Sequence, residues 1–246
     1  MVRGVGTALN VGAILVGSGA GVLLRGRLPQ RTRDVVTDAL GLVVLLVAAT
    51  SAVDVGNSDF RDAVGHSAPV LIVLGALVVG GIAGSLLRVE QRLEEFGEVL
   101  RRRLVRDSGG PSRFVEGFVV ASLVFCVGPL AVLGSFQDGL GHGIDLLSLK
   151  STLDCFAAMA FAAALGWGVA ASAISVGILQ GALTVVGFFL GDLLPAAEVA
   201  ALNATGGLLL VGVALRLLRI KPLPVADLLP ALAVAPALTW LVQTLR

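Results

Sequence analysis

Two polar side chains lie inside apolar stretches of this chain, where water cannot easily reach them. Asp154 follows Lys150 by four residues, so a helix would place both side chains on one face. Gln180 lies in the middle of another apolar stretch, next to Gly181. Buried carboxyl and amide groups can bind a cation or relay a proton. They can also serve structure alone, as a Lys150–Asp154 ion pair and an interhelical hydrogen bond of Gln180.

Other polar or helix-breaking residues in the same stretches extend this candidate site. A substrate or ion pathway would draw on Asn10, Glu116, Cys126, Pro129, Asp154, Gln180 and Asn203. Moving an unpaired polar group from water into hydrocarbon costs on the order of several kcal/mol. Such groups therefore turn toward the interior of the bundle. We therefore expect five of them, Asn10, Cys126, Asp154, Gln180 and Asn203, to approach a common polar cavity. Glu116 has a second explanation, because a carboxylate in the first turn of a helix complements the helix dipole.

The segment from Phe125 to Pro129 predicts an irregular helix. Proline removes a backbone donor and the preceding Gly128 permits close approach, so a kink would free carbonyl groups to line a cavity. An ordinary proline kink without a functional role is the alternative. Cys126 has no neighbouring His or Cys cluster, so we expect a small apolar filler rather than a metal ligand, and no cofactor or metal.

The elements that position these residues are eight apolar stretches. Each is near the roughly 20 residues that cross a hydrocarbon core of about 30 Å. They cover residues 4–24, 35–53, 69–87, 114–136, 149–166, 168–191, 200–219 and 223–245. Composition agrees, since 56% of the residues are hydrophobic, 14% are charged and the mean hydropathy is +0.94. The sequence predicts a single all-α membrane domain, a bundle of about eight transmembrane helices.

The distribution of basic residues predicts the orientation of the bundle. The connections 25–34, 88–113 and 216–222 contain 14 of the 18 Arg and Lys residues. Basic residues collect on the cytoplasmic side. We therefore expect a multi-pass protein of the bacterial cytoplasmic membrane, with both termini outside. The histidines, His66 and His142, then fall in outer loops.

The polar segment at about 88–108 predicts a cytoplasmic amphipathic helix. Its apolar residues repeat at helical spacing, and its basic residues would lie near anionic lipid headgroups. It is either a basic linker that fixes topology or a segment that binds a partner.

A weak internal repeat relates the first two helices to the sixth and seventh. An offset of 166 residues places Gly41-Leu42 on Gly207-Leu208 and Leu28-Pro29 on Leu194-Pro195. The two copies would have opposite orientations in the membrane, as in many secondary transporters. Chance similarity is the alternative, because Leu, Val, Ala and Gly are so common here.

Several motifs resemble a known family. They are Gly6-Thr7-Ala8-Leu9-Asn10, Glu116-Gly117-Phe118, the Phe125–Pro129 segment, Gly134–Leu140, Lys150–Asp154 and Gln180-Gly181. Together they resemble the YqgA-like family of bacterial membrane proteins, over nearly the whole chain. That family is of unknown function, and its members are described as candidate transport proteins. The chain departs from the family pattern at Gly141–Asp145 and at Leu179.

The function expected from these residues is transport of a small solute or ion. The sequence contains none of the HExxH, GxSxG, Walker A or GxGxxG motifs, so we expect no enzyme. A membrane scaffold or assembly subunit is the alternative, although it has little use for Asp154 or Gln180. The expected partners are membrane lipids, an unknown small solute or ion and a second copy of the chain, with no nucleic acid.

Overall fold

A computed structural model describes residues 3–25, 29–104, 111–126, 129–141, 143–190 and 195–245, and all regular elements in these ranges are helices. The helices are α1 (Val5–Arg25), α2 (Gln30–Ala52), η1 (Val53–Gly56), α3 (Ser58–Val64), α4 (Ala68–Leu87), α5 (Val89–Leu104), α6 (Pro111–Cys126), α7 (Pro129–Leu140), α8 (Asp145–Leu165), α9 (Gly168–Leu190), α10 (Ala196–Leu217), η2 (Val225–Leu228) and α11 (Ala231–Thr244). The predicted all-α class is confirmed.

Among the described residues, seven helical segments are long and apolar enough to cross a membrane. The number rises to eight if the bent pair α6–α7 forms one span. The seven are formed by α1, α2 with η1, α4, α8, α9, α10, and η2 with α11. Their positions match the apolar stretches of the sequence. Two predictions fall partly outside the described residues. They are the end of the amphipathic helix predicted at 88–108, and the pairing of Leu28 with Leu194 in the internal repeat.

The chain divides into two compact units, and the boundaries fall inside α2 and α5. Unit 1 comprises residues 1–40 and 93–192, and unit 2 comprises residues 41–92 and 193–246.

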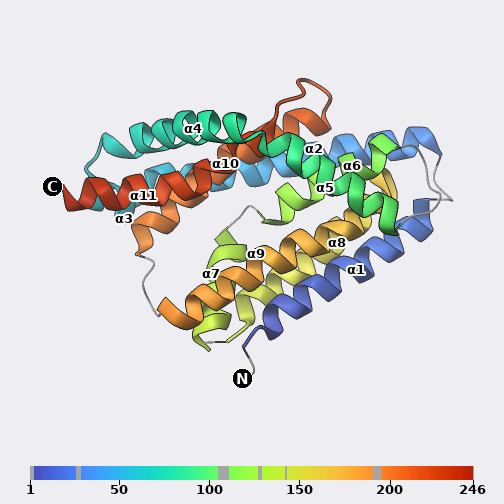
Figure 1. The fold of residues 1–246 in the computed structure, drawn as a ribbon, viewed down its shortest axis with the longest axis horizontal. Coiled ribbons are helices and arrows are strands. Elements are labelled where there is room, and N and C mark those ends of the chain that lie inside the picture. The colour runs from blue at the N-terminus through green and yellow to red at the C-terminus, as the bar shows by residue number, and fades with distance from the viewer. Residues whose placement is uncertain are drawn as a thin grey trace. The chain divides into compact units, whose positions relative to one another are not determined.

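In unit 1, α1 packs against α8 along most of its length, as Figure 1 shows. Glycines permit this approach: a methyl group at Gly17 would collide with the carbonyl oxygen of Cys155, and one at Gly21 with that of Met159. Since Gly17 meets residue 155 and Gly21 meets residue 159, α1 and α8 run parallel. Small residues allow helices in a membrane to pack this closely.

The pair α6–α7 is bent by 78° between Arg113–Cys126 and Leu130–Leu140. Both halves lie against α9, but at opposite ends. A methyl group at Gly168, the first residue of α9, would meet the carbonyl of Phe114, and one at Gly139 would meet that of Thr184. A re-entrant pair would return to the end where it began, so α6–α7 has the form of one broken crossing. The predicted kink is confirmed, and it is larger than the bend of an ordinary proline helix.

In unit 2, α4 packs antiparallel to α11 and α10 lies beside α11, around a core rich in alanine. A methyl group at Gly80 would meet the backbone of Ala231, and one at Gly84 that of Asp227. The core residues of this unit are Phe60, Val64, Ile72, Val73, Ala76, Ala197, Ala200, Ala201, Ala204, Ala231 and Ala235. All are apolar, and seven of the eleven belong to α4 and α10.

Two helix contacts in unit 2 are related by the 166-residue offset of the predicted repeat. Gly41 of α2 packs against Leu218, and Gly207 packs against Ala52 of α2. An offset of 166 residues carries the first contact onto the second, as two related antiparallel helices require. Superposition of the larger segments through an in-plane two-fold axis stays a prediction.

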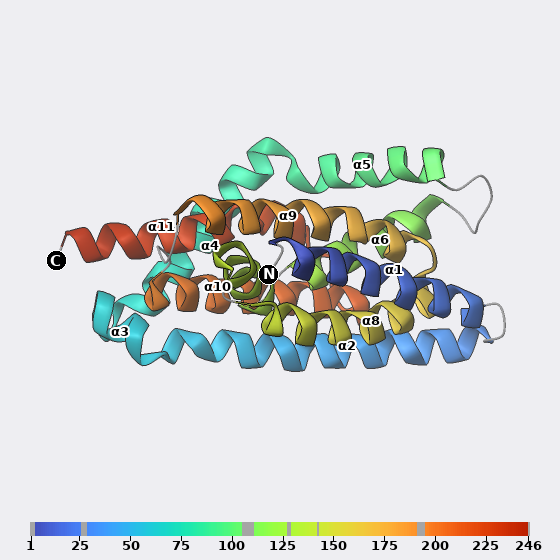
Figure 2. The same cartoon turned by 90° about the horizontal axis from the view of Figure 1, so that it is seen from below.

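The helix α5 follows the end of α4 in Figure 2, after Arg88 adopts a left-handed conformation with φ of 52°. Glu90 fixes its start within unit 2, accepting from Arg216 Nη1 at 2.5 Å and from the Ala226 amide at 2.7 Å. The Glu90 amide donates in turn to Asp227 Oδ1 at 2.8 Å. Asp227 therefore caps the start of α5.

Candidate functional site: a polar cluster in unit 1

Three helices of unit 1 bring their polar side chains into one cluster. Asn10 of α1 donates from Nδ2 to Asp154 Oδ2 at 3.0 Å and to Gln180 Oε1 at 3.3 Å. Lys150 Nζ donates to the same Asp154 oxygen at 2.5 Å. Asn10 and Gln180 are fully buried, and the side chains of Lys150 and Asp154 are 9% and 10% exposed. We call these four residues the polar cluster.

The polar cluster leaves hydrogen-bonding capacity unused. The Oδ1 atom of Asn10 and the Nε2 atom of Gln180 are buried and have no partner among the described residues. If the oxygen and nitrogen of the Asn10 or Gln180 amide were exchanged, two donors or two acceptors would face each other. The hydrogen bonds therefore fix the orientation of both amides. A buried polar group without a partner costs about 1–3 kcal/mol. One acceptor and one donor are thus available to a small polar ligand.

The helices hold the polar cluster deep in the apolar layer. Asp154 lies nine residues after Asp145, the first residue of α8, which corresponds to about 14 Å at 1.5 Å per residue. Gln180 lies twelve residues after Gly168, which corresponds to about 18 Å along α9. Both depths are near the middle of a core about 30 Å thick.

The broken span ends beside the polar cluster. Cys126 is the last residue of α6, which packs against α8 and α9, the helices that carry Asp154 and Gln180. Pro129 begins α7 after the break. That Cys126 approaches Asp154, and that Cys126 and Pro129 take part in a pathway, stay predictions.

Two layers of contacts lie between the polar cluster and the start of α1. Thr7 Oγ1 and Thr184 Oγ1 are 3.3 Å apart, one helical turn from Asn10 and Gln180. Beyond them, the buried carboxylate of Asp138 on α7 accepts from the Gly4 and Gly6 amides, each at 3.0 Å. Asp138 therefore caps the free amides of α1 from another helix. The guanidinium of Arg3 lies 4.5 Å from the ring centroid of Phe188 at the same end.

Two of the predicted site residues, Glu116 and Asn203, are not among the four residues of the polar cluster. Glu116 is half-buried on α6, and Gly117 beside it packs at the beginning of α9, far along that helix from Gln180. Asn203 belongs to α10 in unit 2, where its Nδ2 donates to Asp54 Oδ2 at 2.9 Å. Its Oδ1 is buried without a partner among the described residues.

Sequence reasoning treated Lys150 only as a counter-ion and did not select Asp138. Lys150 belongs to the polar cluster by geometry, and its spacing from Asp154 was the available signal. Asp138 was visible only as part of a family motif, although the glycines at positions 4 and 6 are typical of backbone that meets an anion.

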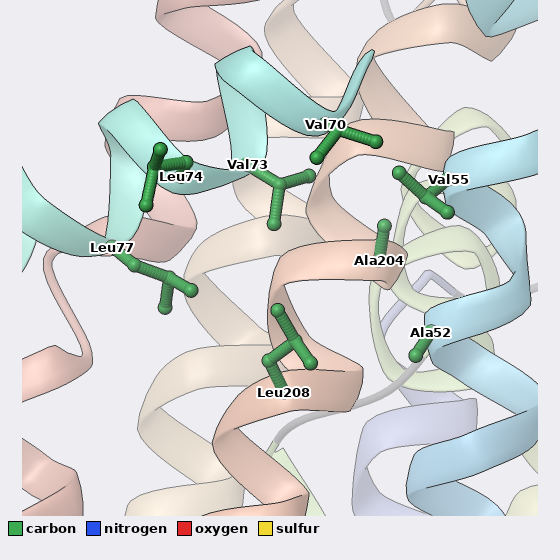
Figure 3. A pocket seen from close by; sticks show the side chains of 8 residues that line it. All are labelled: Ala52, Val55, Val70, Val73, Leu74, Leu77, Ala204 and Leu208. Carbon is green, nitrogen blue, oxygen red and sulfur yellow. The ribbon is translucent and has the colours of Figure 1, made fainter.

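Unit 2 contains a groove of a different character. It has a volume of about 370 Å³ and only apolar side chains point into it, as Figure 3 shows. They are Ala52, Val55, Val70, Val73, Leu74, Leu77, Ala204 and Leu208. Such a surface suits hydrocarbon rather than an ion.

The described residues contain no group of three or more His, Cys, Asp or Glu side chains that could hold a metal ion. The polar cluster has one carboxylate with amide and ammonium groups around it.

Comparison with known proteins gives a family. The family model described as "Protein of unknown function (DUF554)" matches residues 5–240. This chain belongs to that family. It is 29% identical over 237 residues to "Uncharacterized protein YqgA" of Escherichia coli (strain K12), which covers 96% of each chain. It is 23% identical over 238 residues to "Uncharacterized membrane protein YdfK" of Bacillus subtilis (strain 168), covering 97% of this chain and 96% of that protein.

These matches confirm the resemblance and the multi-pass membrane class. A shorter match joins 113 residues to "Putative manganese efflux pump MntP" of Syntrophotalea carbinolica (strain DSM 2380 / NBRC 103641 / GraBd1), at 30% identity. It covers 42% of this chain and 60% of that protein. No solved structure matches the chain.

Proposed function

We propose that this protein is a transporter that moves a small inorganic cation across the cytoplasmic membrane through unit 1. One observation carries the proposal. Side chains of three helices, Asn10, Asp154 and Gln180, converge near mid-membrane depth and leave two buried polar atoms without partners. Intramembrane ionisable residues of this kind mark ion and substrate pathways.

The chemistry of the polar cluster favours a cation. Asp154 supplies the negative charge, and Asn10 Oδ1 supplies a neutral oxygen that lacks a donor. Oxygen ligands suit hard and borderline cations such as Mg²⁺ and Mn²⁺. The partial similarity to a protein named as a manganese efflux pump supports the same class of substrate, and Mn²⁺ is therefore the first cation to test.

The broken span supports transport over a purely structural role. Discontinuous helices at membrane depth are tolerated where they line a cavity, and many transporters place their sites beside them. Here the break follows Cys126, and α6 and α7 both pack against α8, the helix that carries Asp154. A scaffold would be served by a continuous helix and a fully satisfied polar cluster.

The orientation follows from charge. We propose that both termini lie outside and that α5 lies at the cytoplasmic surface, because the connections 25–34, 88–113 and 216–222 contain 14 of the 18 basic residues. Reporter fusions after Arg33, Arg106 and Lys221 should report cytoplasm, and fusions after Asp62, His142 and Glu198 should report the outside. A cytoplasmic signal at His142 would contradict the single broken crossing of α6–α7.

The direct test is cation flux into proteoliposomes that contain the purified full-length chain. A dye trapped in the lumen reports entry of Mn²⁺, with Mg²⁺ and Na⁺ compared by equivalent dyes. We expect flux above that of protein-free vesicles, loss of flux in Asp154→Asn, and normal flux in the exposed control Asp62→Asn. Absence of flux and of cation-dependent stabilisation for all three ions, with stable protein, would favour the scaffold.

A further inference from the structure

Lys150 occupies the place at which a transported cation would meet Asp154. Its ammonium group donates to Asp154 Oδ2 at 2.5 Å, and both side chains are at least nine-tenths buried. A buried carboxylate paired with an ammonium group is electrically neutral, which lowers the cost of keeping both charges out of water. An arriving cation therefore does not find a free carboxylate.

The surrounding helices offer no other charge that could replace Lys150. The helix α9 has no charged residue, and the single charge of α1, Arg25, lies at the end away from Asn10. In α6 the charged residues are Arg113 and Glu116, near its start, and in α7 Asp138 accepts from two backbone amides. On α8 itself, Asp145 is exposed. Lys150 is thus the cation that neutralises Asp154.

On the basis of the proposed function, we infer that Lys150 is a tethered competitor that selects divalent over monovalent cations at Asp154. The transported ion binds by displacing the ammonium group from the carboxylate. A monovalent ion replaces one positive charge by another, so it gains no Coulomb energy and loses the lysine hydrogen bond. The displaced ammonium group must find another acceptor for either ion, and Asn10 Oδ1 is the acceptor of the polar cluster without a partner. That cost is common to both ions, whereas a divalent ion doubles the charge that faces Asp154 and so doubles the Coulomb attraction.

This arrangement is a repulsive element that acts against unwanted ligands. Selectivity is a difference between two affinities, and a group that opposes the wrong ligand contributes to it as much as one that favours the right ligand. Removal of the Lys150 charge leaves Asp154 buried and unpaired. Any small cation that reaches the polar cluster then gains the full attraction of the carboxylate, and the distinction by charge is reduced.

The test measures the thermal unfolding midpoint of the purified full-length chain in MnCl₂, MgCl₂ or NaCl, at constant ionic strength. The wild-type chain should be stabilised by Mn²⁺ and not by Na⁺. Lys150→Met should be stabilised by both, with the Mn²⁺ concentration for half of the maximal shift lowered at least about tenfold, the factor that corresponds to 1.4 kcal/mol. Lys150→Arg should behave as the wild type, and Lys150→Met/Asp154→Asn should respond to neither.

A second uncharged variant, Lys150→Gln, keeps a donor for Asp154 and guards against misfolding of the methionine variant. Unchanged Na⁺ and Mn²⁺ responses in both uncharged variants, with loss of the Mn²⁺ response in Asp154→Asn, would overturn the competitor and leave the cation site intact. Equal stabilisation of the wild-type chain by Na⁺ and Mn²⁺ would also overturn it. No response of any variant to any of the three salts would overturn the cation site itself.

Discussion

The two units use buried polar groups differently. In unit 1, four polar side chains from three helices form one connected cluster, and two of its atoms are left without partners. In unit 2, the groove is apolar throughout, and α10 carries Glu198, Asn203 and Thr205, each with one buried polar atom that has no partner among the described residues. The comparison separates a unit whose buried polar side chains form one hydrogen-bonded cluster across three helices from a unit whose groove is apolar.

The largest expected effect tests this difference directly. Gln180→Leu removes the acceptor for Asn10 and the free donor of the polar cluster, so cation flux should fall to the level of protein-free vesicles. Asn203→Leu in unit 2 removes a buried amide of similar size, whose partner is Asp54, and should retain most of the flux. Flux in proteoliposomes at matched protein content is the measurement. Equal losses in the two variants would show that the units do not divide binding from packing.

The next largest effect is expected at glycines that allow close helix contacts, which both units contain. Gly17 in unit 1 and Gly84 in unit 2 each face the backbone of a neighbouring helix, and Gly19 faces open space. Gly17→Ala and Gly84→Ala should each destabilise the chain by about 1–3 kcal/mol, the usual cost of overpacking, because backbone cannot move aside as a side chain can. Gly19→Ala should be neutral or slightly stabilising, since alanine favours a helix.

Thermal unfolding in detergent gives the ranking of these three glycine variants. If Gly19→Ala proves as costly as Gly17→Ala, helix contact is not the cause. If only Gly17→Ala is costly, close helix packing belongs to unit 1 alone.

Sequence reasoning reached the helices and part of the site. Length and hydropathy gave every span, because the bilayer sets both. Asp154 and Gln180 were selected because a polar residue at mid-depth is costly, and that cost is independent of the neighbours. The partners of those residues depend on which helices touch. Nothing in the spacing of Asn203 could assign it to a different unit from Asn10.

The size of the bend was also beyond the sequence. The Gly128-Pro129 pair predicts an interrupted hydrogen-bond ladder, but the 78° angle depends on how each half packs along α9. The role of Asp138 was hidden for a similar reason. It caps the amides of Gly4 and Gly6, more than 130 positions away, and a cap supplied by another helix leaves no local pattern.

A smaller effect is expected from that cap. Asp138→Asn keeps the shape but removes the charge that accepts from two amides, and a hydrogen bond to a charged group contributes about 1.5–3 kcal/mol. We expect a lower unfolding midpoint and faster exchange of the first amides of α1. The exposed Asp145→Asn is the matched control at the start of α8 and should change neither quantity. Unchanged exchange in Asp138→Asn would mean that the cap does not hold α1.

The smallest effect compares single interhelical bonds in the two units. Ser122 Oγ and Ser175 Oγ are 3.0 Å apart in unit 1, and Asn203 donates to Asp54 in unit 2. Double-mutant cycles with alanine measure the interaction free energy of each pair, separated from the other effects of the single substitutions. Interhelical hydrogen bonds in a membrane average about 0.6 kcal/mol, so we expect roughly that value for the serine pair and a larger one for the pair that includes a carboxylate. A coupling near zero for Asp54 and Asn203 would show that apolar packing, and not this hydrogen bond, holds η1 against α10 in unit 2. A serine coupling well above about 1.7 kcal/mol, the upper end of such bonds, would instead indicate that unit 1 depends on its polar contacts for stability as well as for binding.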